Sequence, residues 1–275
     1  MPTICEFTIT EDEIICDDRY LEIAGGSSLI DYIKTDYFYI GPFSWWRGIP
    51  MPGKAELGNR VLITGQSDYV ISEEIYNRCC AKYRYWFAPN VAVDRPGICP
   101  VPLGISNYNV DKVQYTRVMG NRAVMMNVLR LPFEKTLCAY MNFSIHTNPV
   151  IRQPVWDMFS GRPWVMCGGP IECTDEARTE YLRDMYHSKF TICPQGNGPD
   201  TFRMWEALYM KSIPIVKCHV THKNMDELPI LFIDDWSEVT EELLESVWEE
   251  YSRRDWNMRK LCMSYWRELI HACCA

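Results

Sequence analysis

The stretch YHSKFTICPQGNGPDTFRMWEALYMKSIPIV, residues 186–216, decides the fold of this chain. Lys189–Cys193 is a short apolar run rich in β-forming residues, which predicts a strand. Pro194–Pro199 contains two glycines and two prolines, which predicts a loop. A helix should follow, and Ile213–Val216 should form a second strand. A strand, a helix and a strand of this length make a βαβ unit, which implies a parallel sheet.

The helix of this unit should begin at Asp200 or Thr201, since either residue can cap it. It should run to about Lys211. Its apolar residues recur at helical spacing and are expected to face the core. They are Phe202, Trp205, Leu208 and Tyr209.

A neighbouring stripe of the same helix carries Arg203, Glu206 and Met210, so the two charged side chains should point the same way. A helix N-terminus attracts anions, and a cation beside it suits a phosphate. A carboxylate one turn further on can accept both hydroxyls of a ribose. The pattern favours a sugar-nucleotide site. On spacing alone, the alternative is a common βα turn with a solvated Arg–Glu pair.

Residues 188–216 closely resemble the C-terminal signature of exostosin-like glycosyltransferases, roughly SKF-x-L-C-P-x-G-x-G-x-D-x-x-R-x-W-E-A-L-x-x-G-x-I-P-V. The departures are Gln195, where a basic residue is usual, and Lys211–Ser212, where a glycine is common. The resemblance implies a GT-B architecture, donors that are mostly UDP-linked, and inversion at the transferred sugar. The chain resembles the short members of this family that large algal viruses encode.

The composition is that of a packed globular protein. The chain has 275 residues, 47% of them hydrophobic, and a formal net charge of −8. This charge argues against a nucleic-acid partner. The sequence shows no signal peptide and no run near 18 apolar residues, so no membrane span is expected. The 13 cysteines show no CxxC spacing, so we expect reduced thiols in a cytoplasmic protein, the host cytoplasm if the chain is viral.

Residues 1–134 are expected to form an N-terminal, acceptor-side α/β domain that ends in a linker. Arg60–Gly65 reads as a buried strand. Asp68 follows the carboxyl end of this strand, where open α/β sheets bind ligands. A helix over 75–85 and strands over 85–87 and 98–104 should complete the domain.

Aromatic residues are dense before this strand, in the run YFYIGPFSWW. Trp45 and Trp46 can stack on sugar rings and are, with Tyr69, the predicted acceptor site. A place in the hydrophobic core is the alternative for the two tryptophans.

Residues 135–275 are expected to form a C-terminal, nucleotide-sugar-binding α/β domain with helices at its end. Thr136–Met141 should be its first strand, Asn142–Pro149 a polar loop, and Val150–Phe159 a helix with Arg152 in its first turn. An arginine at a helix start after a strand and a polar loop again suits an anion. Exostosin-like proteins show a similar motif at this place.

The expected fold class is therefore α/β, a compact GT-B-like protein with two Rossmann-like halves that face a cleft. This architecture rests mainly on the resemblance. The alternation of strands and helices by itself also fits one doubly wound domain.

Missing motifs narrow the chemistry. The sequence has no Asp-x-Asp, which argues against a metal-bound diphosphate, and no P-loop, GxSxG or complete GxGxxG motif. We therefore expect no cofactor and no metal. Fixed cations and helix N-termini must then stabilise the charge on the leaving UDP. The predicted diphosphate-binding residues are Arg152, Arg203, Asn197 and Gly198, and Glu206 is the predicted ribose-binding residue.

An inverting transferase needs one general base and no nucleophile. The base should lie across the cleft from the diphosphate, and Asp68 is the best placed carboxylate. An Asx turn is an equally weighted alternative for this residue. His146 and Asp200 are the other candidates, although Asp200 is more simply a helix cap.

These expectations add up to a metal-independent inverting glycosyltransferase that moves a sugar from a UDP-sugar to a saccharide acceptor. By analogy with the short viral members, the sugar is a pentose such as xylose. The alternative is a non-catalytic module that binds a sugar or a nucleotide sugar.

Overall fold

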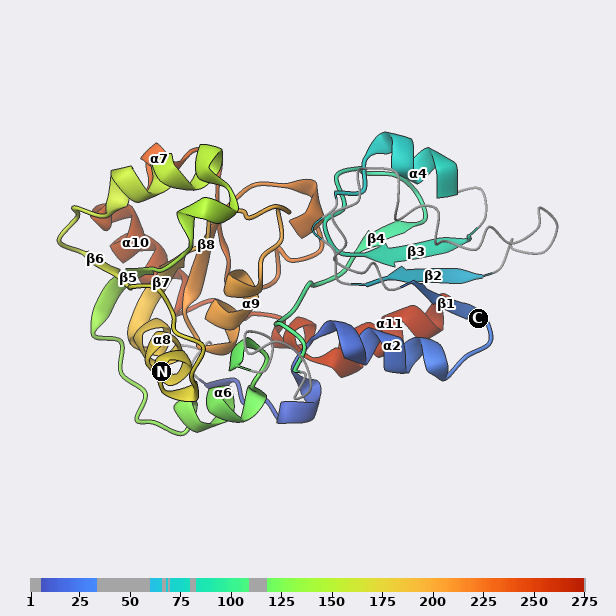
Figure 1. Ribbon diagram of the computed structural model, residues 1–275, viewed down its shortest axis with the longest axis horizontal. Coiled ribbons are helices and arrows are strands. Elements are labelled where there is room, and N and C mark those ends of the chain that lie inside the picture. Colours follow the sequence, from blue (N-terminus) through green and yellow to red (C-terminus); the bar gives the residue numbers. More distant parts are fainter. Residues whose placement is uncertain are drawn as a thin grey trace.

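A computed structural model describes residues 6–33, 60–65, 68, 70–79, 83–108 and 118–274. The described chain forms two α/β halves that lie side by side (Figure 1). One half contains a four-stranded sheet and the other a five-stranded sheet, and all neighbouring strands are parallel. The predicted fold class, α/β with two Rossmann-like halves, is confirmed. None of the helices in these ranges has the length and apolar character that a bilayer span requires.

The first sheet is built from short runs of β-branched and aromatic residues, which suit strands buried on both faces. Its order is β1 (Ile30–Ile33), β2 (Val61–Thr64), β3 (Tyr85–Ala88) and β4 (Ile98–Pro100). All four residues of β2 are buried. Because side chains alternate along a strand, Val61 and Ile63 join one core cluster and Leu62 another.

Helices cover both faces of this sheet. On one face, the cluster of Val61 and Ile63 includes residues of α2 (Asp17–Gly25) and α11 (Met263–Ala272). On the other face, Leu62 packs with residues of α4 (Glu73–Cys79). Figure 1 shows α4 above the strands and α2 and α11 below them.

The second sheet has the order β6-β5-β7-β8-β9. Its strands are β5 (Leu137–Met141), β6 (Val165–Cys167), β7 (Ser188–Ile192), β8 (Ile213–Lys217) and β9 (Leu231–Ile233). One face packs with α7 (Pro149–Phe159) and α10 (Glu241–Tyr251), and the other with α6 (Arg122–Val128), α8 (Asp175–His187) and α9 (Phe202–Tyr209). Single 3-10 turns complete the described chain at Glu11–Glu13, Ile145–Thr147, Val220–His222, Trp236–Glu238 and Met258–Leu261.

The βαβ unit expected from residues 186–216 is present as β7, α9 and β8, and the two strands pair in parallel. Thr201 occupies the N-cap position of α9 without a side-chain capping bond. The helix stops before Lys211, whose backbone φ of 56° is left-handed and therefore incompatible with a continued α-helix. Trp205, Leu208 and Tyr209 are buried as predicted, whereas Phe202 is only partly buried.

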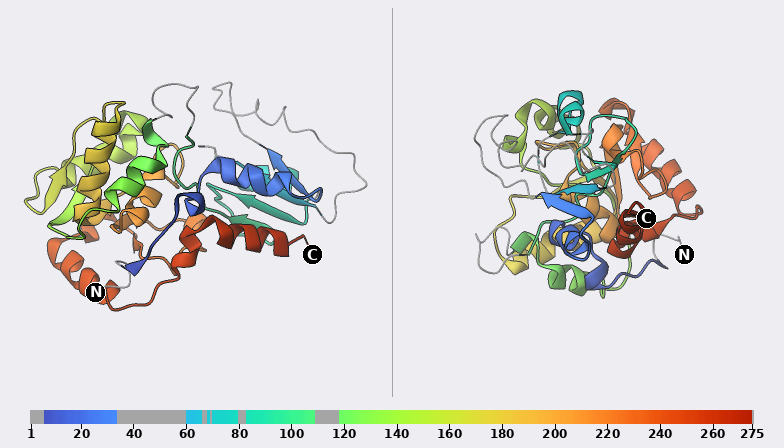
Figure 2. Two further views of the ribbon diagram at one scale, coloured as in Figure 1. Left: turned by 90° about the horizontal axis from the view of Figure 1, so that it is seen from below. Right: turned by 90° about the vertical axis from the view of Figure 1, so that its right-hand side faces the viewer.

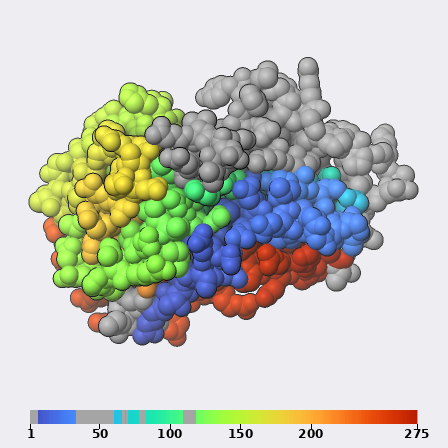
Figure 3. Space-filling model, turned by 60° about the horizontal axis from the view of Figure 1, so that its bottom comes forward, coloured from blue at the N-terminus to red at the C-terminus, as the bar shows by residue number. Residues whose placement is uncertain are grey.

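The N-terminal and C-terminal segments of the described chain contact each other. An isolated antiparallel bridge joins Ile14 to Cys262, and the amide of Ser264 donates to the Glu13 carboxylate at 2.8 Å. Figures 1 and 2 show α11 beside α2, and Figure 3 shows the N-terminal and C-terminal segments adjacent on one face. The last helix, expected within the nucleotide-binding half, therefore packs under the first sheet. The boundary near residue 134 remains a prediction.

The segment before the first sheet is a helix over Asp17–Gly25, which a turn at Gly26 separates from strand β1. Strand β9 begins at Leu231, because Leu228 and Ile230 form a turn in which the Ile230 amide donates to the Leu228 carbonyl.

Candidate functional site

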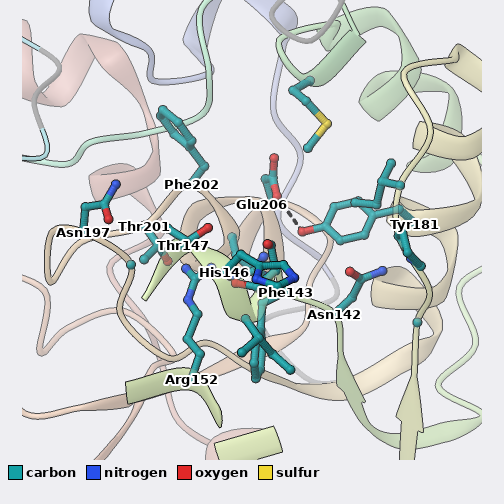
Figure 4. Close-up of a pocket in the computed structure, with 18 of the residues that line it drawn as sticks. Asn142, Phe143, His146, Thr147, Arg152, Tyr181, Asn197, Thr201, Phe202 and Glu206 are labelled. Atoms are coloured by element: carbon teal, nitrogen blue, oxygen red, sulfur yellow. Dashed lines mark hydrogen bonds between the residues drawn. The ribbon is translucent and has the colours of Figure 1, made fainter. Parts of the chain in front are cut away.

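A cavity of about 980 Å³ opens where the two halves meet (Figure 4). Most of its wall comes from the loops that follow β5, β6 and β7 and from the first turns of α9. The first half contributes Asp68, Leu103 and Ser106. The volume is at the upper end of the range for small-molecule sites.

The position of the cavity follows from the strand order. β6 lies on one side of β5 and β7 on the other, so the chain reverses its direction across the sheet between β5 and β7. The loops after these two strands diverge there and leave a crevice at the carboxyl ends of the strands, which is where open α/β sheets bind ligands. Residues 142–147, 196–198, 200 and 201 of these two loops line the cavity.

Arg152, the fourth residue of α7, connects these two loops. Its Nε donates to the Gln195 carbonyl at 3.0 Å, and its Nη1 donates to the Ser144 carbonyl at 2.8 Å. The side chain of Asn148 adds a third link by donating to the Gly196 carbonyl at 2.8 Å. Arg152 is buried and lines the cavity, so it fixes the shape of the crevice and brings a positive charge to it. The sequence pattern predicted the positive charge of Arg152 at this site, but not its hydrogen bonds between the two loops.

Arg203 lies in the first turn of α9 and lines the same cavity. Its guanidinium group stacks over the Phe143 ring, 5.7 Å from the ring centroid, and the Arg152 guanidinium lies at the same distance from that ring. A guanidinium over an aromatic face is held in place by cation–π attraction. Two arginines from different helices therefore lie near one ring at the cavity wall.

The loop between β7 and α9 approaches the first half closely. The Asn197 amide nitrogen donates to the Asp68 carboxylate at 3.0 Å, which joins a predicted diphosphate residue to the predicted base. A Cβ atom at Gly198 would stand 2.6 Å from the side-chain amide of Asn90. Only glycine leaves room for this contact. Asp68, Asn197 and Gly198 all line the cavity.

Glu206, the predicted ribose residue, is 2% exposed and lines the cavity from the second turn of α9. Its Oε1 accepts from Arg178 Nη2 at 2.7 Å. Its Oε2 accepts from the Tyr181 hydroxyl at 2.8 Å (Figure 4). Arg178 is a site residue that the sequence motifs did not single out. Its spacing was a signal, because it shares the apolar face of α8 with Tyr181, Leu182 and Met185.

Asp200 lines the cavity but is engaged elsewhere. Its carboxylate accepts from the Leu103 amide and from the Trp205 indole, both at 2.8 Å, and its own amide donates to the Asn90 side chain at 2.9 Å. Burial raises the pKa of Asp200 to about 7, against the lowering effect of these donors. Asp200 therefore ties α9 to the first half instead of acting as a simple helix cap. His146 lies exposed at the cavity wall.

Three predicted acceptor residues, Trp45, Trp46 and Tyr69, lie outside the described residues. Across the ranges that are described, no group of three or more His, Cys, Asp or Glu side chains could hold a metal ion. Metal independence and the individual roles of the site residues remain predictions.

Residues 170–271 match a family model described as the RXYLT1 C-terminal domain, a glycosyltransferase-like family. The match covers a little over a third of the chain and includes α8, β7, α9 and β8. Among solved structures, an alpha1,3-fucosyltransferase crystal structure aligns with 90% of this chain and 78% of its own, at 11% identity and a TM-score of 0.46. No curated protein matches.

Proposed function

We propose that this protein transfers a sugar from a UDP-sugar to a saccharide acceptor, without a metal and with inversion at the transferred carbon. The observation that carries the proposal is one cavity at the reversal point of the second sheet, lined by Arg152, Arg203 and Glu206 from the second half and by Asp68 from the first half. The match to the RXYLT1 C-terminal domain and the exostosin-like signature support it.

In this mechanism the second half binds the donor. Arg203 and the start of α9 face the diphosphate, and Arg152 adds a second positive charge at the same wall. These groups stabilise the negative charge that grows on UDP as it leaves. Glu206 accepts hydrogen bonds from the ribose hydroxyls.

The first half supplies the base. Asp68 takes the proton of an acceptor hydroxyl. At the same time the hydroxyl oxygen of the acceptor forms a bond to the anomeric carbon of the donor sugar, and the bond from that carbon to UDP breaks. One displacement inverts the anomeric carbon, and UDP leaves with the electron pair. The hydrogen bond from the Asn197 side chain to the Asp68 carboxylate supports this role, because it holds Asp68 beside the loop between β7 and α9.

The donor sugar is proposed by analogy to be a pentose such as xylose. The competing function is a binding module that holds a nucleotide sugar without transferring it. The Asp68 carboxylate, beside the loop between β7 and α9, favours the transferase, because a module that only binds a nucleotide sugar needs no base.

The test is a transfer assay in EDTA, with the purified protein, a panel of UDP-sugars and a panel of neutral oligosaccharides. The proposal expects release of UDP with one donor and an acceptor product heavier by one sugar residue. A folded protein that binds UDP but releases none with any pair of substrates would reject the transferase in favour of the binding module.

A further inference from the structure

Arg178 is the most deeply buried charged side chain of α8, with no exposed surface. It does not line the cavity, yet its Nη2 reaches Glu206, which does. Its guanidinium group also lies 5.1 Å from the ring centroid of Tyr181. Arg178 thus stands behind the cavity wall and contacts both side chains that face the cavity at this point.

This buried ion pair contributes little to the stability of the fold. Two charges have been removed from water, and Arg178 Nε and Nη1 have no hydrogen-bond partner among the described residues. A buried ion pair with unsatisfied donors is usually no better for folding than an apolar pair of the same size. A role at the neighbouring cavity explains why the charged side chain of Arg178 is buried here.

The geometry at Glu206 indicates that use. Its carboxylate offers about four acceptor positions, and Arg178 and Tyr181 occupy one on each oxygen. Each oxygen keeps one lone pair for a ligand, which matches the two adjacent hydroxyls of a ribose. Burial raises the pKa of Tyr181 well above its ordinary value, so its hydroxyl remains a donor to Glu206 at neutral pH.

We propose that Arg178 and Tyr181 are positioning residues that orient the Glu206 carboxylate to accept both hydroxyls of the donor ribose, which makes the site selective for ribonucleotides over 2′-deoxyribonucleotides. The inference rests on the proposed function and assigns a specificity to its donor site. Neither residue contacts the reacting atoms. A loosely held carboxylate accepts one hydroxyl as well as two, so loss of either support should weaken UDP more than 2′-deoxy-UDP.

The test is calorimetric titration of the full chain with UDP and with 2′-deoxy-UDP. The wild type should bind UDP about tenfold more tightly. Tyr181→Phe removes one hydroxyl and should bring the ratio of the two dissociation constants close to one, and Arg178→Met should do the same. The matched control is Tyr186→Phe on the same helix, whose hydroxyl bonds to the Leu131 carbonyl, and it should keep the wild-type ratio.

The ratio separates positioning from general packing, because a structural defect lowers both affinities together and lowers the melting temperature. Tyr181→Phe decides the matter if Arg178→Met fails to fold. A folded Tyr181→Phe that keeps the wild-type ratio overturns the inference and leaves the proposed function standing. A wild type that binds neither nucleotide overturns both.

Discussion

The described strands of the first sheet follow one another in chain order, β1-β2-β3-β4, whereas the second sheet has the order β6-β5-β7-β8-β9. The chain therefore reverses direction only within the second sheet, as far as the described strands show. A reversal separates two neighbouring loops and opens a crevice between them. The difference explains why loops of the second half form most of the cavity wall, while the first half contributes mainly Asp68 and the segment near Leu103.

The same contrast appears in the chemistry. The second half brings two arginines and a carboxylate held by buried neighbours, which suits tight binding of a nucleotide. The first half brings Asp68, which is only partly buried. We call the cavity lining from the second half the binding wall, and the lining from the first half, with Asp68, the reacting wall. The two are therefore expected to respond differently to mutation.

Asp68→Asn should give the largest effect on turnover. Without a base, transfer should fall about 10²- to 10⁴-fold, while the affinity for UDP should stay within about twofold, since Asn can still contact Asn197. Steady-state rates and UDP titration measure the two quantities. The matched control is Asp94→Asn, an exposed carboxylate of the same half that pairs with Lys223. Equal losses of turnover and UDP affinity would mean that Asp68 belongs to the binding wall.

Asp200→Asn should change how stability depends on pH. Burial raises the pKa of Asp200 to about 7, so the folded protein holds this proton more tightly than the unfolded chain does. The stability gained from this group is complete below about pH 4 and is lost as the pH rises through 7, up to about 4 kcal/mol. Asn does not titrate, so the variant should gain stability relative to wild type over this range.

Urea unfolding at about pH 5 and about pH 8 measures this difference in the free energy of unfolding. A difference for Asp200→Asn that is the same at both pH values would show that the buried carboxylate does not take up a proton on folding.

Asn90→Ala should cost about 1–3 kcal/mol of stability, because it leaves the buried amide of Asp200 without its partner. Asn90 also has a left-handed backbone, with φ of 53°, which alanine tolerates less well. Lys223→Ala removes an exposed ion pair between the halves and should cost no more than about 1 kcal/mol. Thermal unfolding compares the two variants. A larger loss from Lys223→Ala would place the main link between the halves at the surface.

The sequence predicted the second half well for a physical reason. In residues 186–216 a short apolar strand, a loop rich in Gly and Pro, and a helix with a regular apolar stripe all point to one local structure. Those signals are local, and β7, α9 and β8 follow them. The cations of the site were also predictable, because Arg152 and Arg203 lie at helix starts that follow strands.

What the sequence did not reveal depends on contacts between distant segments. The strand Ile30–Ile33 is only four residues long and follows a helix closely, so no periodicity marks it. The apolar stripe of α11 predicts a buried face but not which sheet it covers. The residues of the buried pair Arg178 and Glu206 are 28 positions apart in the chain and lie on two helices, so the pattern of one helix cannot reveal the pair.

The most direct test of the binding wall is titration of UDP into the wild type and into Arg203→Ala, with EDTA present. The matched control is Arg183→Ala, a half-exposed arginine of α8 outside the cavity lining. We predict micromolar binding to the wild type and to the control, and a loss of about 10- to 100-fold in Arg203→Ala. Absence of UDP binding, or equal affinity in all three proteins, would contradict a nucleotide site at the reversal point of the second sheet.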